Sequence, residues 1–302
     1  GPLAGVSTMP FRELIWQYSQ PAWVCSEMIS AKSILCGRQH ILRRYLSISP
    51  NEGPLSIQIA TADADEAARA CTELNQYDIS LVDLNAGCPV KKIRQRSQGS
   101  SLLSQAKKLE AIIIAMRSCS SFPISVKIRV DGHCSDYNKS VLDAVNSAMP
   151  DFLIVHARSY QDGYDVAIHT EQLAYFTEHA LMPVIGNGDV ADAASTNKIL
   201  AHGCDAAMIS RASVGAPWLI NQIQYGLKLT QTSSLPSMSQ RWPVFVQHIF
   251  ALAKLLGHDA HAIAHAQGLI KYYARHNNFS RSTIATLRTA QSLDDLLTII
   301  AS

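Results

Sequence analysis

Short apolar segments rich in β-branched residues recur along the first 211 residues of the chain. Amphipathic segments of helical length separate several of them, for example residues 65–76 and 108–119. Continuous apolar strands joined by helices are typical of a parallel sheet that is covered on both faces. The predicted strands lie within residues 22–28, 55–60, 79–85, 123–129, 152–158, 183–188 and 205–211.

Seven such segments, with one further strand near the N-terminus, give the strand count of an eight-stranded barrel. We therefore predict an α/β protein with a (β/α)8 TIM barrel. The first strand is the weak point of this prediction, because the chain begins directly with GPLAGV at residues 1–6. A doubly wound open sheet is the structural alternative.

The character of the sequence changes after residue 230. Residues 230–243 are rich in Ser, Thr and Pro, and the segments that follow have a purely helical pattern. We therefore predict a barrel domain at residues 1–232 and a small helical bundle at residues 233–302. The helical segments are residues 244–257, 262–276, 280–290 and 293–301.

Composition places any basic surface in one region. The chain of 302 residues is 47% hydrophobic, and 26 basic and 24 acidic residues give a formal charge of +2, which excludes a strong overall field. Residues 241–302 are the mildly basic part. There, Lys271 and Arg275 are spaced to share a helix face, with Tyr272 and Tyr273 between them. This pattern fits either an ordinary solvated face over core tyrosines or a helix that binds an RNA backbone.

The seven cysteines include no CxxC pair and no zinc-type cluster. They indicate free thiols in a reducing compartment rather than a disulfide scaffold. No signal peptide or membrane-spanning apolar run is visible in the sequence, so we expect a cytoplasmic protein, and a monomer. The cysteines are Cys25, Cys36, Cys71, Cys88, Cys119, Cys134 and Cys204.

Polar side chains stand at or just after the end of each predicted strand. One such residue alone can be a loop residue or a helix cap. Seven consecutive strands with this feature instead indicate a functional rim, because functional groups of such barrels lie at the carboxyl ends of the strands. The residues are Glu27, Gln58, Asn85, Cys88, Lys127, Arg129, His156, Arg158, Asn187, Asp189, Ser210 and Arg211.

The loops after the last two predicted strands have the composition of a phosphate site. They read IGNGDV at residues 185–190 and ISRASVGAPW at residues 209–218. Gly186 and Gly188 allow a close approach of the backbone to an anion, and Arg211 supplies a cation. Such loops can serve a substrate, flavin mononucleotide (FMN) or no ligand at all.

Several of these segments, in this order and spacing, resemble the tRNA-dihydrouridine synthases. They are PLAGVSTMPFR at residues 2–12, VDLNAGCPVKKI at 82–93, SVKIR at 125–129, VHARS at 155–159, PVIGNGDV at 183–190 and MISRASVGAPW at 208–218. The helical tail is similar to the RNA-binding domain of that family. The resemblance implies an FMN enzyme that uses NADPH to reduce a uridine in the D-arm region of tRNA.

Uracil reduction gives the Gly-Cys-Pro segment a chemical role. Hydride addition to carbon 6 leaves an enolate-like charge, and a general acid must then protonate carbon 5. The resemblance implies that Cys88 is this acid, and an unperturbed thiol, with a pKa of about 8.5, is mostly protonated at neutral pH. The basic loop of Lys91, Lys92, Arg94 and Arg96 is expected to hold the RNA while the base is flipped out.

The resemblance divides the other residues between cofactor and substrate. The expected cofactor contacts are Pro2, Leu3, Ala4, Gln58, Lys127, His156, Asn187, Gly188, Asp189, Ser210 and Arg211. The expected substrate and tRNA contacts are Asn85, Lys91, Lys92, Arg94, Arg96, Arg129, Arg158, Lys271 and Arg275.

The chain departs from the family pattern at three places. Ser210 replaces the first Gly of the phosphate loop, GSSLL stands at residues 99–103 in place of GGALL, and Asp162 stands near an expected Gln. Two alternatives therefore stay open: a flavin barrel that reduces a free pyrimidine, and a weakly active tRNA-binding paralogue. The helical tail and the basic loop argue against the first, because a small substrate needs neither.

Overall fold

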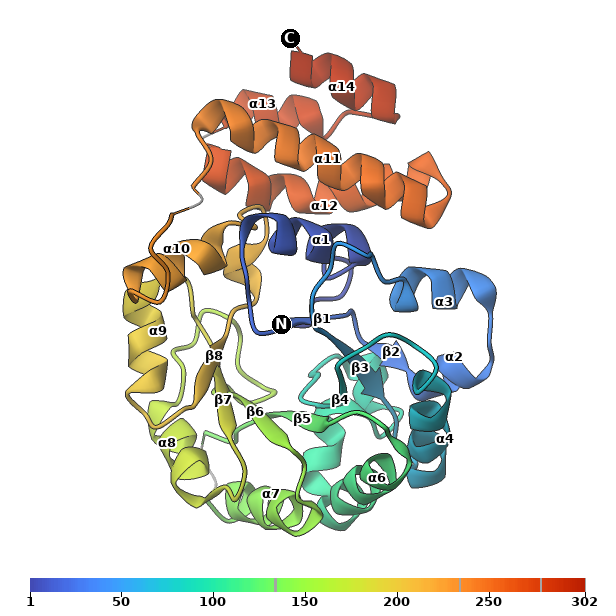
Figure 1. The fold of residues 1–302 in the computed structure, drawn as a ribbon, viewed down its shortest axis with the longest axis vertical. Coiled ribbons are helices and arrows are strands. Elements are labelled where there is room, and N and C mark those ends of the chain that lie inside the picture. The colour runs from blue at the N-terminus through green and yellow to red at the C-terminus, as the bar shows by residue number, and fades with distance from the viewer. Residues whose placement is uncertain (133–134, 234, 278, 302) are drawn as a thin grey trace.

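The computed structural model describes residues 1–132, 135–233, 235–277 and 279–301. Among these residues lies one curved sheet of eight parallel strands, in which each strand from β3 to β8 pairs with the next one along the chain (Figure 1). Two short strands, β1 and β2, both pair with β3. The strands are β1 (Val24–Cys25), β2 (Ile29–Ser30), β3 (Leu55–Ala60), β4 (Leu81–Ala86), β5 (Ile124–Arg129), β6 (Phe152–His156), β7 (Val184–Asn187) and β8 (Ala206–Met208).

Side chains inside the sheet show that it curls into a barrel. Cys25 of β1, Ile154 of β6, Ile185 of β7 and Met208 of β8 form one buried cluster, although no strand pairing joins β8 to β1 within the described residues. Each of the seven segments predicted to form a strand contains one. The predicted α/β barrel followed by helices is therefore confirmed.

The N-terminal segment is the exception, because it forms a turn where we expected an eighth strand. The carbonyl of Leu3 accepts hydrogen bonds from the N–H groups of Val6 and Ser7, each at 3.0 Å. The N–H of Leu3 donates to Oγ of Ser7 at 2.7 Å. These backbone groups are used within the turn and cannot also pair with a strand.

Helices cover the outside of the barrel. Helix α6 illustrates the pattern, since Leu109, Ile112, Ile113 and Met116 fall on one face and are all fully buried. The helices of this part are α1 (Met9–Tyr18), α2 (Ala31–Leu35), α3 (Gln39–Leu46), α4 (Ala64–Leu74), α5 (Lys91–Arg94), α6 (Ala106–Cys119), α7 (Ser135–Ala148), α8 (Thr170–His179), α9 (Ala193–Leu200) and α10 (Leu219–Gly226), with 3-10 turns η1 (Gly99–Ser104) and η2 (Arg211–Ser213).

The remaining helices pack together at one end of the molecule (Figure 1). Their hydrophobic core includes Phe245 and Ile270, and it also takes in Leu14 of α1 and Trp218 from the barrel part. The predicted boundary near residue 232 falls between α10 and α11 and stays a prediction, because this core crosses it. The helices are α11 (Met238–Leu256), α12 (Asp259–Asn277), α13 (Arg281–Leu287) and α14 (Leu293–Ala301).

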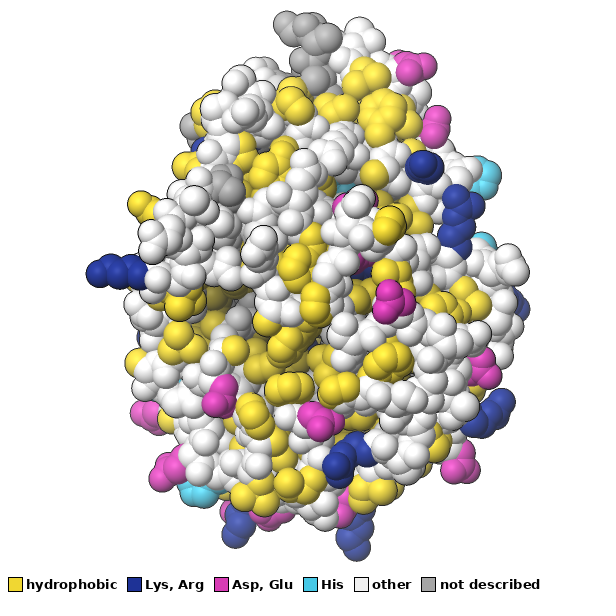
Figure 2. Space-filling view, in the orientation of Figure 1, with side chains coloured by type: hydrophobic (Ala, Val, Ile, Leu, Met, Phe, Trp, Pro, Cys, Tyr) yellow, Lys and Arg dark blue, Asp and Glu magenta, His cyan; other side chains and the backbone are white. Residues whose placement is uncertain are grey.

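Within the part of the chain that the structure describes, no helix is long and apolar enough to cross a membrane. The described cysteines are free thiols, as expected, while Cys134 lies outside the described residues. Lys and Arg side chains stand mainly around the edge of the face shown in Figure 2, and apolar side chains gather at its centre. This distribution agrees with the absence of a strong overall charge.

Candidate active site

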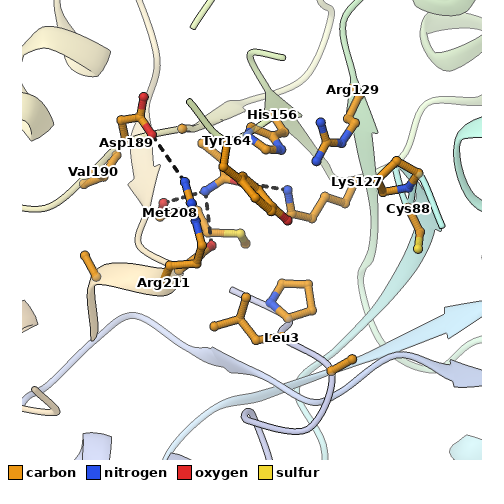
Figure 3. A pocket seen from close by; sticks show the side chains of 18 of the residues that line it. Leu3, Cys88, Lys127, Arg129, His156, Tyr164, Asp189, Val190, Met208 and Arg211 are labelled. Atoms are coloured by element: carbon orange, nitrogen blue, oxygen red, sulfur yellow. Dashed lines mark hydrogen bonds and ion pairs between the residues drawn. The ribbon is translucent and has the colours of Figure 1, made fainter. Parts of the chain in front are cut away.

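A cavity of about 660 Å³ opens at the carboxyl ends of the strands (Figure 3). Its volume lies within the range of roughly 300–1,000 Å³ that is typical of small-molecule sites. All the residues expected to contact the cofactor line it. The predicted site residues in its wall are Pro2, Leu3, Ala4, Gln58, Asn85, Cys88, Lys127, Arg129, His156, Asn187, Gly188, Asp189, Ser210, Arg211, Lys271 and Arg275.

Cys88 lies at this cavity on a braced turn directly after β4. Oδ1 of Asn85 accepts hydrogen bonds from the backbone N–H of Cys88 at 2.9 Å and of Gly87 at 3.4 Å. The carbonyl of Cys88 accepts a bond from the N–H of Ser100 at 3.0 Å. Gly99 has a φ of 61°, and a Cβ there would lie 2.7 Å from that carbonyl oxygen. The half-buried thiol is therefore held at a fixed position on the rim.

A chain of side-chain hydrogen bonds leads from the barrel interior to this turn. Buried Asp83 accepts bonds from Oγ of Ser125 and from Nε2 of Gln58, both at 2.6 Å. Oε1 of Gln58 then accepts a bond from Nδ2 of Asn85 at 2.7 Å. Burial raises the pKa of Asp83, while the bonds from Ser125 and Gln58 favour its charged form. Because the two oxygens of Asp83 accept these bonds, Asp83 orients the amide of Gln58, which in turn directs the oxygen of Asn85 toward the Cys88 turn.

Lys127 extends from β5 into the middle of the cavity (Figure 3). Its Nζ donates to Oδ1 of Asn187 at 2.9 Å, and Nδ2 of Asn187 donates to the carbonyl of Met208 at 2.8 Å. Burial lowers the pKa of Lys127 to about 8. In the described structure no carboxylate is bonded to this ammonium group, so it can pair with an anionic group in the cavity.

His156 ends β6 at the same cavity. Burial, together with the positive charges of Lys127, Arg129, Arg158 and Arg211, lowers its pKa to about 2. The imidazole is therefore neutral at physiological pH. It can donate or accept a hydrogen bond to a ligand, but it does not act there as a cation.

Arg211, Asp189 and Tyr164 form one side of the cavity (Figure 3). The guanidinium of Arg211 lies 3.8 Å from the centroid of the Tyr164 ring and 3.5 Å from Oδ1 of Asp189. Gly188 has a φ of 140°, and a Cβ at this position would lie 2.7 Å from Ile168. A cation beside a position that only glycine can occupy has the chemistry of a phosphate site.

Arg158 braces the loop after β6 and does not line the cavity. Its side chain is 1% exposed and forms an ion pair with Asp189. Its Nε donates to the carbonyl of Val166 at 2.6 Å, and its Nη2 donates to the carbonyl of Tyr164 at 3.3 Å. The guanidinium that we expected to contact the substrate is therefore engaged within the protein.

The predicted basic loop also lies outside this cavity. Lys91, Lys92 and Arg96 are exposed on or beside α5. Arg94 lies over the ring of Tyr160, with its guanidinium carbon 3.9 Å from the ring centroid. The expected RNA contacts of this loop stay predictions.

Helix α12 brings Lys271, Tyr272 and Arg275 to the cavity wall. Gly215 allows the close approach of this helix, because it has a φ of 79° and a Cβ there would lie 2.7 Å from the backbone nitrogen of Tyr273. The cations of the helical part and the strand ends of the barrel therefore share one cavity. From the sequence alone, this helix could equally have presented an ordinary solvated face.

Two residues of the site escaped prediction from the sequence. Tyr164 enters the cavity from the loop after β6, where an aromatic residue follows an Asp-Gly turn signal. Asp83 precedes Asn85 by two residues in β4, and the period of a strand places the two side chains on the same face. The turn signal could have indicated Tyr164, and the period of the strand could have indicated Asp83.

Comparisons with known proteins show the family of the chain. A family model described as dihydrouridine synthase (Dus) matches residues 1–301. The chain is 30% identical over 261 residues to the "Probable tRNA-dihydrouridine synthase 1" of Synechocystis sp. (strain ATCC 27184 / PCC 6803 / Kazusa), a match that covers 85% of this chain and 72% of that protein. It is also 30% identical over 259 residues to the "tRNA-dihydrouridine synthase B" of Pseudomonas putida, covering 85% of this chain and 76% of that protein.

Proposed function

Because the chain belongs to the dihydrouridine synthase family, we propose that it uses FMN and NADPH to reduce a uridine in the D-arm region of tRNA to 5,6-dihydrouridine. The observation that carries this proposal is the distribution of groups around one cavity. Cys88 lies on one side, Arg211 lies on the opposite side, and Lys127 lies between them (Figure 3). An acid and an anion site are thus separated by a cation.

The cavity residues fit FMN in their charges and their shape. Arg211 suits its phosphate, because the guanidinium at the cavity wall can form charge-assisted hydrogen bonds to an anion. Lys127, which has no carboxylate bonded to it in the described structure, suits a ring that carries negative charge. Neutral His156 can add a hydrogen bond to the ring. When bound, FMN would supply the hydride for carbon 6 of the uracil.

The protein itself supplies the proton. In our proposal, Sγ of Cys88 donates its proton to carbon 5, and the thiolate that remains is later reprotonated from solvent. Arg129 lines the same cavity. Burial lowers the pKa of Arg129, and Tyr164 and Cys88 raise it again in part. The bond from the Cys88 N–H to Asn85 keeps the thiol in place during the transfer.

A uridine within tRNA must leave its stack to reach this cavity. Lys271 and Arg275 lie at the cavity wall and can hold the RNA backbone there. Exposed Lys91, Lys92 and Arg96 can contact further phosphates beside the Cys88 turn. A free pyrimidine would need none of these cations, so their position favours an RNA substrate.

Replacement of Cys88 tests the proposal. Cys88→Ala is expected to keep its fold, its FMN content and the reduction of its FMN by NADPH, because none of these needs a proton from the uracil side. Formation of dihydrouridine should slow by about 100- to 10,000-fold, the usual contribution of a positioned general acid. The measurement is anaerobic rapid mixing of pre-reduced protein with an unmodified tRNA transcript, followed by flavin absorbance and by the dihydrouridine content of the RNA.

Cys36→Ala serves as the matched control, since Cys36 is an exposed free thiol that does not line the cavity. A wild-type protein that binds no FMN, or that forms no dihydrouridine in any tRNA, would refute the proposed function. Wild-type rates in the Cys88→Ala protein would instead refute only the role of Cys88. Reduction of free uridine in preference to tRNA would favour a pyrimidine reductase.

A further inference from the structure

A second, smaller cavity of about 180 Å³ lies on the same rim, between the loops that follow β4, β5 and β6. Among the described residues, it shares no lining residue with the larger cavity. Its walls are polar apart from two tyrosine rings. The lining residues are Arg94, Ser100, Ser101, Ser104, Asp131, Tyr137, Ser159, Tyr160 and Gln161.

Two residues that line this small cavity each carry a buried polar atom without a partner. Nε of Arg94 and Oγ of Ser100 are both buried, and neither has a hydrogen bond in the described structure. Ser100 as a whole is only 2% exposed. Buried polar atoms without partners are costly and rare in native proteins. Five occur in the described part of this chain, and the concentration of two of them in one small cavity points to a ligand.

The charge of the ligand follows from Arg94. Its guanidinium carbon lies 3.9 Å from the ring centroid of Tyr160, and in the described residues it has no ion pair and no hydrogen bond. A guanidinium held over an aromatic ring is already ordered and presents its N–H donors to an anionic oxygen. The carboxylate of Asp131 also lines the cavity and disfavours a doubly charged anion. A singly charged phosphodiester fits better than inorganic phosphate.

The position of the cavity links it to the reaction. The N–H of Ser100 donates to the carbonyl of Cys88 at 3.0 Å, and Ser100 also lines the small cavity. Nη1 of Arg129, from the larger cavity, donates at 2.7 Å to the carbonyl of Ser159, which lines the smaller one. The two cavities therefore share a wall. Arg94 therefore lines a cavity directly beside the Cys88 turn.

We propose that this cavity binds one phosphodiester group of the substrate RNA close to the target uridine, an inference that rests on the proposed function. Arg94 and Ser100 supply the hydrogen-bond donors. The site fixes the strand beside the flipped nucleotide, so it governs which linkage of the RNA lies next to Cys88.

Two variants of the full-length, FMN-loaded protein test the inference. Arg94→Gln should weaken binding of an unmodified tRNA transcript about tenfold, in line with loss of a charge-assisted bond. Ser100→Ala should also weaken binding, yet its melting temperature should equal or exceed that of the wild type, because it removes a buried hydroxyl without a partner. Both variants should keep the wild-type FMN content.

A chemical scan of the RNA then locates the contact. Neutral methylphosphonate linkages are placed one at a time along the D arm of a synthetic tRNA. Neutralising one linkage near the target should weaken RNA binding by the wild type. The same change should not weaken binding by the Arg94→Gln protein. Arg96→Gln is the control, because it removes the same charge from the same loop at a residue that lines neither cavity. Its binding should still weaken when that linkage is neutralised.

The outcomes separate the two proposals. Equal sensitivity of the wild type and Arg94→Gln at every linkage would overturn the inference, as would a Ser100→Ala protein that melts earlier and binds tRNA normally. Binding of inorganic phosphate by the wild type that is lost in Arg94→Gln, with no effect of phosphate on tRNA affinity beyond that of chloride at equal ionic strength, would assign the cavity to free phosphate instead. Failure of the wild type to bind any tRNA would refute the proposed function as well.

Discussion

A lysine inside a barrel, bonded to an amide rather than to a carboxylate, is costly to keep charged. Lys127 is in this position, since its Nζ donates to Oδ1 of Asn187 and burial lowers its pKa to about 8. A polar group is kept at such a cost where it contributes to function, because a well-packed apolar residue is more stable there. The cost falls when an anion binds beside the ammonium group.

The same residue gives a pH dependence with a definite sign. The folded pKa of about 8 is lower than the unfolded value of about 10.4, so the native state binds fewer protons between these pH values. The free energy of unfolding contributed by Lys127 therefore rises from pH 8 to about pH 10.4. Urea unfolding of the ligand-free protein at several pH values should show this rise in the wild type and a smaller one in Lys127→Met.

The wild type must be compared with Lys127→Met because tyrosines also titrate between pH 8 and about 10.4. Lys139→Met, which removes an exposed lysine, provides the control and should retain the wild-type rise. Parallel stability curves for the wild type and Lys127→Met would show that Lys127 keeps an ordinary pKa.

At the scale of elements, the loop after β6 depends on one buried arginine. Arg158 bonds the carbonyls of Val166 and Tyr164 and pairs with Asp189 of the next loop. The loop closes on its strand where the N–H of His169 donates to the carbonyl of Ala157 at 2.7 Å. Arg158 thus sets the position of Tyr164, and with it one side of the larger cavity.

Arg158→Met should release this loop. We expect a loss of roughly 1–3 kcal/mol in the free energy of unfolding, because two carbonyls lose a charged donor while the partly exposed Asp189 can be solvated. Limited proteolysis should cut residues 159–168 faster than in the wild type. Arg117→Met is the control, since Arg117 also bonds a carbonyl but is exposed, and its loss should cost about 0.5 kcal/mol or less. Unchanged cleavage and stability in Arg158→Met would remove the bracing role.

The same loop shows where prediction from the sequence stops. The barrel strands were predictable because apolar runs and helical segments alternate along the chain. The family resemblance implied that Arg158 contacts the substrate, yet the loop folds back and its carbonyls accept the hydrogen bonds of this side chain. The chain from Asp83 to Asn85 was not predictable as a network either, because it depends on the pairing of Gln58 with Asp83 across β3 and β4. A single sequence does not contain that register, nor the point at which a loop folds back.

For the whole molecule, the helical part forms one wall of the larger cavity. Lys271 and Arg275 of α12 line the larger cavity, although this helix begins 51 residues after the end of the last strand, β8. Exposed cations elsewhere stand mostly at the edge of the molecule in the view of Figure 2. Binding of RNA should therefore depend on where a cation lies rather than on the net charge of +2.

Joint replacement of Lys271 and Arg275 by Gln tests this dependence. The affinity for tRNA should fall. The logarithm of the association constant should also fall less steeply with the logarithm of the salt concentration, by about 1.4–1.8 in the magnitude of the slope if both residues contact phosphates. Reduction of FMN by NADPH should not change. The paired variant Arg281→Gln and Arg288→Gln removes two exposed cations of α13 and its C-terminal end, outside the cavity.

An equal loss of affinity in both pairs would mean that only total charge matters. An unchanged salt slope in the Lys271 and Arg275 variant would exclude α12 from the RNA interface. The second result would leave α12 as the ordinary solvated face that its sequence pattern also allowed.

Gly215 limits how the orientation of α12 can change during evolution. The backbone of α12 lies so close that a Cβ at this glycine would meet the nitrogen of Tyr273 at 2.7 Å and the carbonyl carbon of Tyr272 at 2.8 Å. A tilt of α12 that suited an RNA of another shape would either open the cavity or make the helix collide with the loop that contains Gly215. Descendants can therefore change their RNA preference stepwise through exposed side chains of α12, whereas a new orientation of the helix requires simultaneous change on both sides of the contact.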